Sequence, residues 1–223
     1  MTAPATARSE QTRAQIVEAA LRLFRERGYA GTTMRAVAEE AGVSVGNAYY
    51  YFRSKDELVQ GFYDQLAADH RAASAPVLAR TTDLGERVAG TLNAWLSIAE
   101  HYHAFAGRFF AVAAQPGNPL SPFSSASHAA RDAELALWDD VLAGSSTRIA
   151  AQLRARLPEL LWLYQLGIVL FWVHDSSPGL RRTRELVGRS APLVARLVRL
   201  ARLPTLGPVV RQAADLAASL RGS

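Results

Sequence analysis

The sequence predicts an all-α protein in which a small N-terminal helical unit is joined by a long helix to a larger helical body. Apolar residues recur every three or four positions, and no stretch alternates with period two for long enough to form a strand. Proline and glycine separate the helical stretches. The 223 residues, 49% hydrophobic and 20% charged, are typical of a globular protein and exclude a mainly disordered chain.

The first helix is expected from Ser9 to Arg27. Ile16, Ala20 and Leu23 fall on one face of it, and Gly28 ends it. About eight residues precede it, rich in alanine, threonine and proline, and they are expected to form a mobile arm.

Two short helices follow. Thr33 is a good N-cap for a helix from Met34 to about Glu40, and Gly42 suits a sharp helix end in the left-handed conformation. Ser44 can then cap a second short helix that ends near residues 51–52. Two helices joined by a short turn that contains glycine form the helix-turn-helix layout.

A long helix is expected to start near Lys55 and to reach the region of Pro76, with the domain boundary inside it. The remaining patterns predict helices at about residues 83–114, 124–143, 146–157, 158–176, 179–202 and 208–221. The segment QPGNPLSP, residues 115–122, is expected to be a loop.

The composition of the chain excludes several kinds of site and suggests a class of partner. The absence of cysteine excludes disulfides, thiolate metal sites and cysteine nucleophiles, and the formal charge of +5 suggests a polyanionic partner. The longest apolar run, Leu160 to Val173, has 14 residues, whereas a membrane span needs about 20. The start of the chain lacks the apolar core of a secretory signal. A cytoplasmic protein without a membrane partner is therefore expected.

The second short helix, VGNAYYYF, has an unusual composition for a core helix. Ala48 and Phe52 can pack inward, which leaves Asn47 and three consecutive tyrosines mostly outside. Exposed tyrosines suit contacts with DNA phosphates, sugars and thymine methyl groups. Gly46 permits close approach to a groove, and Asn47 can pair with a base edge.

The long helix opens with a capping box, in which Ser54 and Glu57 can bond each other's backbone N–H groups. Lys55 lies in the first turn, where a cation opposes the helix dipole by about 0.3–1 kcal/mol. This position suggests that Lys55 meets a phosphate beside the free backbone N–H groups.

The segment from Ser9 to about Asp69 resembles the DNA-binding domain of the TetR family of bacterial transcriptional regulators. The resemblance rests on RERGYAGTT, VAEEAGVS and GNAYYYFRSKDEL, which stand at the family's spacings. The sequence departs from the family at Tyr51, where many relatives carry histidine, and at Ala48, where a larger aliphatic residue is common. The expected domains are thus residues 9–69, with the helix-turn-helix at about 32–51, and residues 70–223, for ligand binding and dimerisation.

The resemblance also implies roles for single residues. Those that match phosphate-binding positions are Thr33, Tyr50, Tyr51 and Lys55. Those that match positions near the bases are Arg35, Val45, Gly46, Asn47 and Tyr49. Together with Ser44, they form the predicted DNA-binding set. Arg35 is the best candidate for a guanine contact, because arginine to guanine is the commonest specific pairing. Tyr49 as a core residue and Val45 as a residue that only shapes the turn remain alternatives.

Relatives of this type are dimers that pair their last long helices. A seam suitable for this runs along residues 179–202, at Leu186, Ser190, Leu193, Leu197 and Leu200. The alternative is that the seam belongs to the core of a single chain.

Aromatic side chains crowd the middle of the body, which suits a pocket for a partly hydrophobic or aromatic small molecule. The expected walls are Trp95, Phe109, Trp138 and Trp162, and the expected polar contacts are His103 and His174. Aromatic residues at helical spacing are also typical of plain core. No cofactor motif, metal cluster or catalytic constellation is recognisable, so an enzyme is not expected.

Two functions remain open. The first is a homodimeric repressor that reads a palindromic double-stranded operator and is released by a small-molecule effector; activation is a variant that the sequence does not separate. The second is a helical small-molecule-binding or enzyme-like protein whose N-terminal motif does not bind DNA. That second hypothesis leaves the exposed tyrosines and Lys55 without a purpose.

Overall fold

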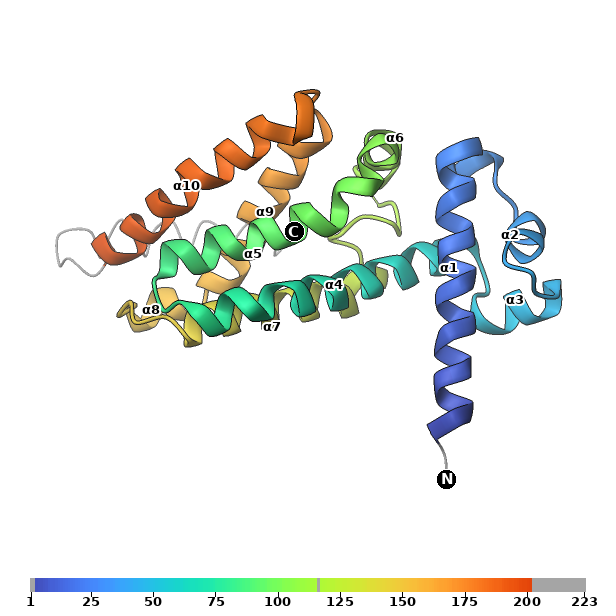
Figure 1. The fold of residues 1–223 in the computed structure, drawn as a ribbon, viewed down its shortest axis with the longest axis horizontal. Coiled ribbons are helices and arrows are strands. Elements are labelled where there is room, and N and C mark those ends of the chain that lie inside the picture. Colours follow the sequence, from blue (N-terminus) through green and yellow to red (C-terminus); the bar gives the residue numbers. More distant parts are fainter. Residues whose placement is uncertain (1–2, 116, 202–223) are drawn as a thin grey trace. The chain divides into compact units, whose positions relative to one another are not determined.

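A computed structural model describes residues 3–115 and 117–201, and within these ranges the chain is helical, without strands (Figure 1). The chain divides into two compact units. The first comprises Met1–Ala67 and His101–Arg131, and the second comprises Ala68–Glu100 and Asp132–Ser223. The all-α prediction is confirmed. The predicted boundary at residues 69–70 stays a prediction; the division into compact units falls after Ala67 and places residues 101–131 with the first unit.

The first unit contains α1 (Ala3–Gly31), α2 (Met34–Glu40), α3 (Val45–Tyr51), the first part of α4 (Lys55–Arg80), α6 (His103–Ala113) and the 3-10 turn η2 (Ser125–Ser127). Helix α1 begins at Ala3, six residues before the predicted start at Ser9. The regular helical backbone of α1 is broken at Gly28, which has φ 75°. Glycine tolerates this conformation because it has no β-carbon.

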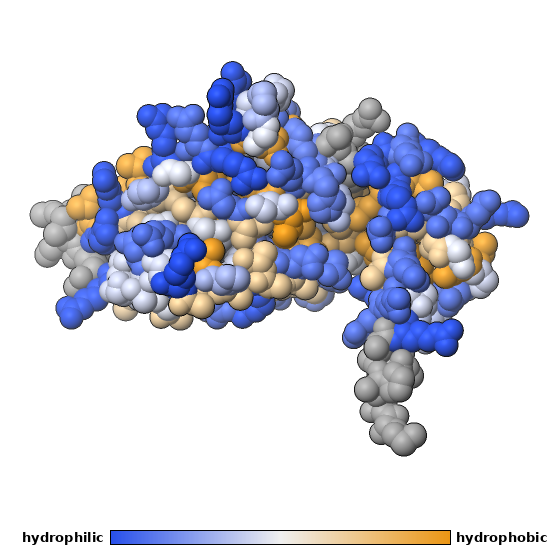
Figure 2. All heavy atoms as spheres, viewed as in Figure 1, coloured by the Kyte–Doolittle hydropathy of each residue, from blue (hydrophilic) through white to orange (hydrophobic). Residues whose placement is uncertain are grey.

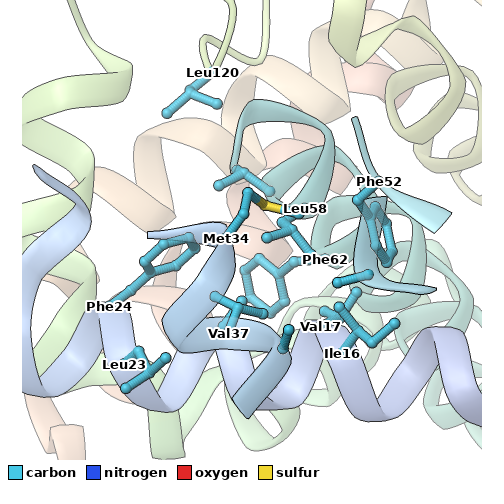
Figure 3. Packing of buried hydrophobic residues seen from close by; sticks show 14 of the residues in the cluster. Ile16, Val17, Leu23, Phe24, Met34, Val37, Phe52, Leu58, Phe62 and Leu120 are labelled. Carbon is cyan, nitrogen blue, oxygen red and sulfur yellow. The ribbon is translucent and has the colours of Figure 1, made fainter. Parts of the chain in front are cut away.

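Apolar residues from several helices form the core of the first unit (Figure 3). Ile16 and Phe24 come from α1, Val37 from α2, and Phe52 follows α3 directly; all are at most 2% exposed. Leu120 joins the same core from the loop after α6. This loop is tied to α4, since the hydroxyl of Tyr63 donates to the carbonyl of Leu120 at 2.9 Å.

The second unit is built from the rest of α4 with α5 (Leu84–Ala99), α7 (His128–Ala143), α8 (Ala151–Arg154), α9 (Leu157–Val173) and α10 (Arg181–Leu200). Helix α7 starts at the end of the first unit and continues into the second. Helix α10 packs along α5 and against α9. The rings of Trp95 and Trp172 meet edge-on at 5.2 Å between centroids, which ties α5 to α9.

Two predicted helices differ from the structure, and a third is not tested by it. The helix expected at 83–114 is interrupted by the 3-10 turn η1 (Glu100–Tyr102), where the chain passes from the second unit to the first. Beyond this turn the ring of Tyr102 packs edge-on against Phe62 at 5.0 Å. Apolar residues keep a helical spacing on both sides of this turn, so the sequence gives no sign that the chain passes from one unit to the other there. The helix expected at 208–221 lies outside the described residues.

The helix expected at 146–157 is also wrong, because only the short α8 is helical there. The residues after α7 are held in a non-helical connection by the carbonyl of Thr82. It accepts hydrogen bonds from the hydroxyls of Ser145 and Ser146 at 3.2 Å and from the N–H of Ser146 at 2.9 Å. Such side-chain bonds to the backbone compete with helix formation.

A buried arginine organises one end of the second unit. Arg87 of α5 is 3% exposed, and its guanidinium donates to four backbone carbonyls. Two of them belong to the end of α4, Leu78 at 2.7 Å and Thr81 at 2.8 Å. The other two belong to the end of α7, Asp140 at 2.8 Å and Val141 at 2.7 Å. One cation therefore caps the negative C-terminal ends of two helices.

A second buried polar group links three helices of this unit. His70 of α4 is fully buried, and its Nδ1 lies 3.0 Å from both carboxylate oxygens of Glu134 on α7. Its Nε2 lies 3.0 Å from the carbonyl of Thr91 on α5. Partners on both sides of the ring satisfy a group that would be costly to bury alone.

Asp175 closes the connection between α9 and α10. Its carboxylate is 3% exposed and accepts the N–H and hydroxyl of Ser177 at 2.9 and 2.6 Å, and those of Thr183 at 2.8 and 2.7 Å. Burial by itself raises the pKa of Asp175, but these four hydrogen bonds outweigh it and hold the pKa well below its usual value of 3.8.

Replacing Asp175 with asparagine is expected to lower the free energy of unfolding at pH 7 by about 2–4 kcal/mol, because charge-assisted hydrogen bonds are removed. Since the pKa is depressed in the folded state, the stabilisation is present above pH 3.8 and disappears as the pH falls below it. Urea unfolding at pH 7, 5, 4 and 3 should therefore show the gap between wild type and variant closing at low pH. Asp132→Asn, at an exposed position of α7, is the matched control. Equal stability of Asp175→Asn and wild type at pH 7 contradicts the assignment.

Among the described residues, no helix combines the length and apolar character that a membrane span requires.

Candidate nucleic-acid interface

The helix-turn-helix has the local structure that its sequence predicts. The Thr33 side chain caps α2 by accepting the N–H of Ala36 at 3.2 Å, and Ser44 caps α3 by accepting the N–H of Asn47 at 3.1 Å. Gly42 has φ 67°, and the turn is closed by the N–H of Val43 on the carbonyl of Ala38 at 2.9 Å. Both predicted caps and the predicted left-handed glycine are confirmed.

Helix α3 buries one narrow edge and exposes the rest. Ala48 is fully buried in the core, whereas Tyr49 is 49% and Tyr50 80% exposed. Val45 is 40% exposed, and Gly46 and Asn47 are exposed beside it. The burial of Ala48 against the core of the first unit turns the tyrosines on the other side of α3 outward.

Tyr51 differs from its two neighbours, because it is only half-exposed. Its hydroxyl lies 3.3 Å from the hydroxyl of Ser9 on α1, and its ring meets that of Tyr50 edge-on at 5.2 Å. The sequence alone did not indicate the contact with Ser9, which lies 42 positions away.

Lys55 has a partner within the protein. Its ammonium donates to the carbonyl of Tyr29 at 2.8 Å and lies 4.5 Å from the centre of the Tyr29 ring. The Tyr29 hydroxyl in turn donates to Asp56, and burial together with this bond raises the pKa of Tyr29. Lys55 therefore joins the end of α1 to the start of α4, and two of its three N–H donors remain for a phosphate.

Half of the capping box before α4 forms as predicted, and its second bond goes to Arg53 instead of Ser54. The Ser54 hydroxyl accepts the N–H of Glu57 at 3.2 Å, and the Glu57 carboxylate accepts the N–H of Arg53 at 2.7 Å. This places the exposed side chain of Arg53 between α3 and α4, next to the predicted DNA-binding set, although no sequence signal had singled out this residue. Thr33 and Arg35, at the start of α2, are exposed as well.

The six residues predicted to line a ligand pocket are divided between the two units. In the first unit His103 is half-buried and opens α6, and the ring of Phe109 packs against Tyr63 at 6.0 Å. In the second unit Trp95, Trp138 and Trp162 are buried, at 7%, 0% and 5% exposure. His174 ends α9.

Trp138 makes a specific polar contact within the core of the second unit. Its indole N–H donates to the side-chain oxygen of Gln165 at 2.8 Å, and Gln165 is itself 4% exposed. The tryptophans therefore lie in packed core in this structure, and their part in ligand binding stays a prediction.

A groove of about 290 Å³ lies at the surface between α5 and α10. Its walls carry opposite charges, with two acidic and two basic side chains over a floor of small residues. Its lining residues are Asp83, Gly85, Glu86, Ala89, Pro192, Ala195, Arg196 and Arg199. None of the six predicted ligand residues lines it.

Helix α10 exposes a leucine stripe beside its buried face. Leu193, Leu197 and Leu200 are 54%, 65% and 45% exposed, whereas Val187 and Ala191 are buried against the rest of the unit. Orange side chains reach the surface around α10 in Figure 2, next to blue ones. Leu186 and Ser190 continue the stripe and are half-buried.

The stripe extends onto α9. The Tyr164 and Ser190 hydroxyls are hydrogen-bonded at 2.5 Å and hold the two helices together at this surface. On α9 itself the side chains of Leu163, Leu170 and Phe171 are 39%, 46% and 42% exposed. We call this apolar face of α9 and α10 the bundle face.

Two family descriptions match the sequence. Residues 16–61 match "Bacterial regulatory proteins, tetR family", and residues 87–220 match "Tetracyclin repressor-like, C-terminal domain". The second match alone spans more than half of the chain.

Curated relatives match over part of the chain. The chain is 50% identical over 62 residues to the HTH-type transcriptional regulator TtgR of Pseudomonas putida, which is 28% of this chain and 30% of that protein. It is 38% identical over 96 residues to the HTH-type transcriptional repressor KstR2 of Mycobacterium tuberculosis, which is 41% of this chain and 46% of that protein. The matches thus span less than half the length of these relatives.

Solved structures share the fold over most of the chain. A TetR-family regulator from Syntrophomonas wolfei superposes with a TM-score of 0.66 at 17% identity, covering 83% of this chain and 95% of that one. FadR from Bacillus subtilis, solved with stearoyl-CoA, superposes with a TM-score of 0.60 at 18% identity, covering 79% and 97%.

Proposed function

Because this chain belongs to the TetR family of bacterial regulatory proteins, we propose that it is a sequence-specific DNA-binding transcriptional regulator that works as a homodimeric repressor. It reads a palindromic operator with two copies of α3 and is released when a small molecule binds the helical body. It acts by binding and not by catalysis.

The exposed face of α3 carries the DNA-binding proposal. A seven-residue helix that buries only Ala48 and exposes two tyrosines gains little stability from them. The same side chains, with Asn47 and Gly46, can enter a major groove and contact base edges. Around them Thr33, Tyr51, Lys55 and Arg53 are placed at helix ends, where contacts to phosphates hold a recognition helix in register.

The bundle face supports the homodimer. Two copies of α9 and α10 can cover each other's leucines in a four-helix arrangement, which would remove a large exposed apolar surface from water. A dimer also presents two copies of α3, as a palindromic operator requires.

The aromatic core of the second unit supports an effector with a large apolar part. FadR of Bacillus subtilis, which shares this fold, holds stearoyl-CoA. A ligand that binds better to a conformation unsuited to DNA shifts the population away from the operator. Addition of aromatic and long-chain acyl compounds to the protein–DNA complex, followed by fluorescence anisotropy, identifies the effector by release of the duplex.

Selection of duplexes from a random library by the full chain tests the function. We expect an inverted repeat to be recovered. Replacing Asn47 with alanine should weaken binding of the selected duplex by about 1–3 kcal/mol, or roughly 5- to 150-fold, for each half-site, and leave binding of scrambled DNA unchanged. Fluorescence anisotropy at fixed salt measures both.

The matched control is Asn93→Ala, because Asn93 lies in the second unit and bonds its own helix at the carbonyl of Ala89. That variant should bind like wild type. Recovery of no preferred sequence, or equal discrimination by Asn47→Ala and wild type, contradicts the proposal.

A further inference from the structure

The first turns of α1 reach the end of the recognition helix. The Ser9 hydroxyl lies 3.3 Å from that of Tyr51. One turn later the Arg13 guanidinium lies 5.0 Å from the centre of the Phe52 ring and 3.7 Å from the carboxylate of Asp64. Ser9 and Arg13 thus attach the start of α1 to the C-terminal end of α3 and to α4.

Gly61 of α4 makes room for this attachment. A β-carbon there would lie 2.8 Å from the Phe52 ring and 3.2 Å from Nη2 of Arg13. Both distances are shorter than ordinary van der Waals contacts. The close approach of Arg13, Phe52 and α4 therefore depends on glycine at this position.

This part of α1 contributes little to the core. Residues 8–15 are all exposed or half-exposed, and the buried face of the helix begins at Ile16. In Figure 1 the first turns of α1 extend past α2 and α3 within the same unit. An exposed extension of about two turns has no evident value for packing, so its position beside α3 calls for another role.

Arg8 supplies the charge that the extension offers. Its side chain is exposed, and no described residue forms an ion pair with it, whereas Arg13 is engaged with Phe52 and Asp64. A phosphate oxygen that accepts a hydrogen bond from Tyr51 at about 2.7 Å lies within about 6 Å of the Ser9 hydroxyl. The long, forked side chain of the adjacent Arg8 can bridge such a gap and bind the phosphate.

We propose that Arg8 and Ser9 form a second DNA-contacting element, which binds the sugar-phosphate backbone of the operator next to Tyr51. The inference rests on the proposed function and adds to it a contact outside the helix-turn-helix. Because it is made to phosphate, it strengthens binding to any sequence and carries no base preference.

The test compares full-length wild type, Arg8→Ala and Arg8→Lys on the duplex recovered by selection and on a scrambled duplex of equal length, between 50 and 200 mM salt. Each neutralised phosphate contributes about 0.9 to the slope of log K against log salt, so Arg8→Ala should reduce the slope of a dimer by about 1.8. Affinities for both duplexes should fall by the same factor in Arg8→Ala, and Arg8→Lys should recover most of the slope.

Arg25→Ala is the matched control, because Arg25 is an exposed arginine on the same helix but 17 positions further along. It should leave the slope unchanged. If Arg8→Ala shows the same slope of log K against log salt as wild type, and wild type binds the selected duplex normally, this inference is overturned. The proposed function then still stands. Failure of wild type to prefer any duplex overturns the proposed function and this inference with it.

Discussion

Replacing Arg87 with methionine is expected to lower the free energy of unfolding by about 3–5 kcal/mol, because several buried carbonyls lose a hydrogen bond from a charged donor, each worth about 1–3 kcal/mol. Methionine has an unbranched apolar side chain like the aliphatic part of arginine, but it has no hydrogen-bond donor. The carbonyls at the ends of α4 and α7 would then be deprived of four hydrogen bonds from a charged group. Urea unfolding followed by circular dichroism measures the change.

Gly144→Ala is expected to have an effect of the same kind, because a β-carbon at this position would overlap the guanidinium of Arg87. The control is Arg80→Met, at an exposed position in the last turn of α4, which should change stability by less than about 0.5 kcal/mol. If Arg87→Met is as stable as Arg80→Met, the four carbonyl contacts do not hold the second unit together.

Replacing Leu197 with glutamate is expected to convert the proposed dimer into a single 24.2-kDa chain. Leu197 is 65% exposed in one chain, so the charge should not disturb the fold of that chain. At the centre of a closed bundle face, however, two copies of an unpaired carboxylate would have to be desolvated. Sedimentation velocity measures the change of mass.

The same variant should bind the operator about 10²–10⁴-fold more weakly, because a monomer binds only one half-site and forgoes the gain from linking two. Ala136→Glu places the same charge at an exposed position of α7 and serves as the control for mass and DNA binding. A dimeric Leu197→Glu with unchanged circular dichroism excludes the bundle face as the interface.

The helix-turn-helix could be predicted closely because its signals are local. The caps Thr33 and Ser44 and the left-handed Gly42 act within three or four residues of themselves, so the sequence contains the whole interaction. The inward position of Ala48 follows from the same short helix. The exposure of Tyr49 and Tyr50 then follows from the helical period alone.

The predictions of helices at 83–114 and 146–157 were wrong because the helical spacing of apolar residues continues where the chain changes unit or is held by distant residues. The spacing over 83–114 is helical on both sides of Glu100–Tyr102, and nothing in it marks the passage of the chain from one unit to the other. The connection after α7 is irregular because the carbonyl of Thr82, more than 60 positions earlier, satisfies the donors of Ser145 and Ser146.

By itself, the sequence determined that the protein is helical, where its helix-turn-helix lies and which face of α3 is exposed, because helix periods, caps and turns are short-range properties. Only the tertiary structure decided how the cations are used. It buries Arg87 against two helix ends, engages Lys55 with Tyr29 and leaves Arg8 exposed next to Ser9, which contacts α3. The physical reason is that a charged side chain interacts with whatever the fold brings within a few ångströms, and those partners can lie tens of residues away in the chain.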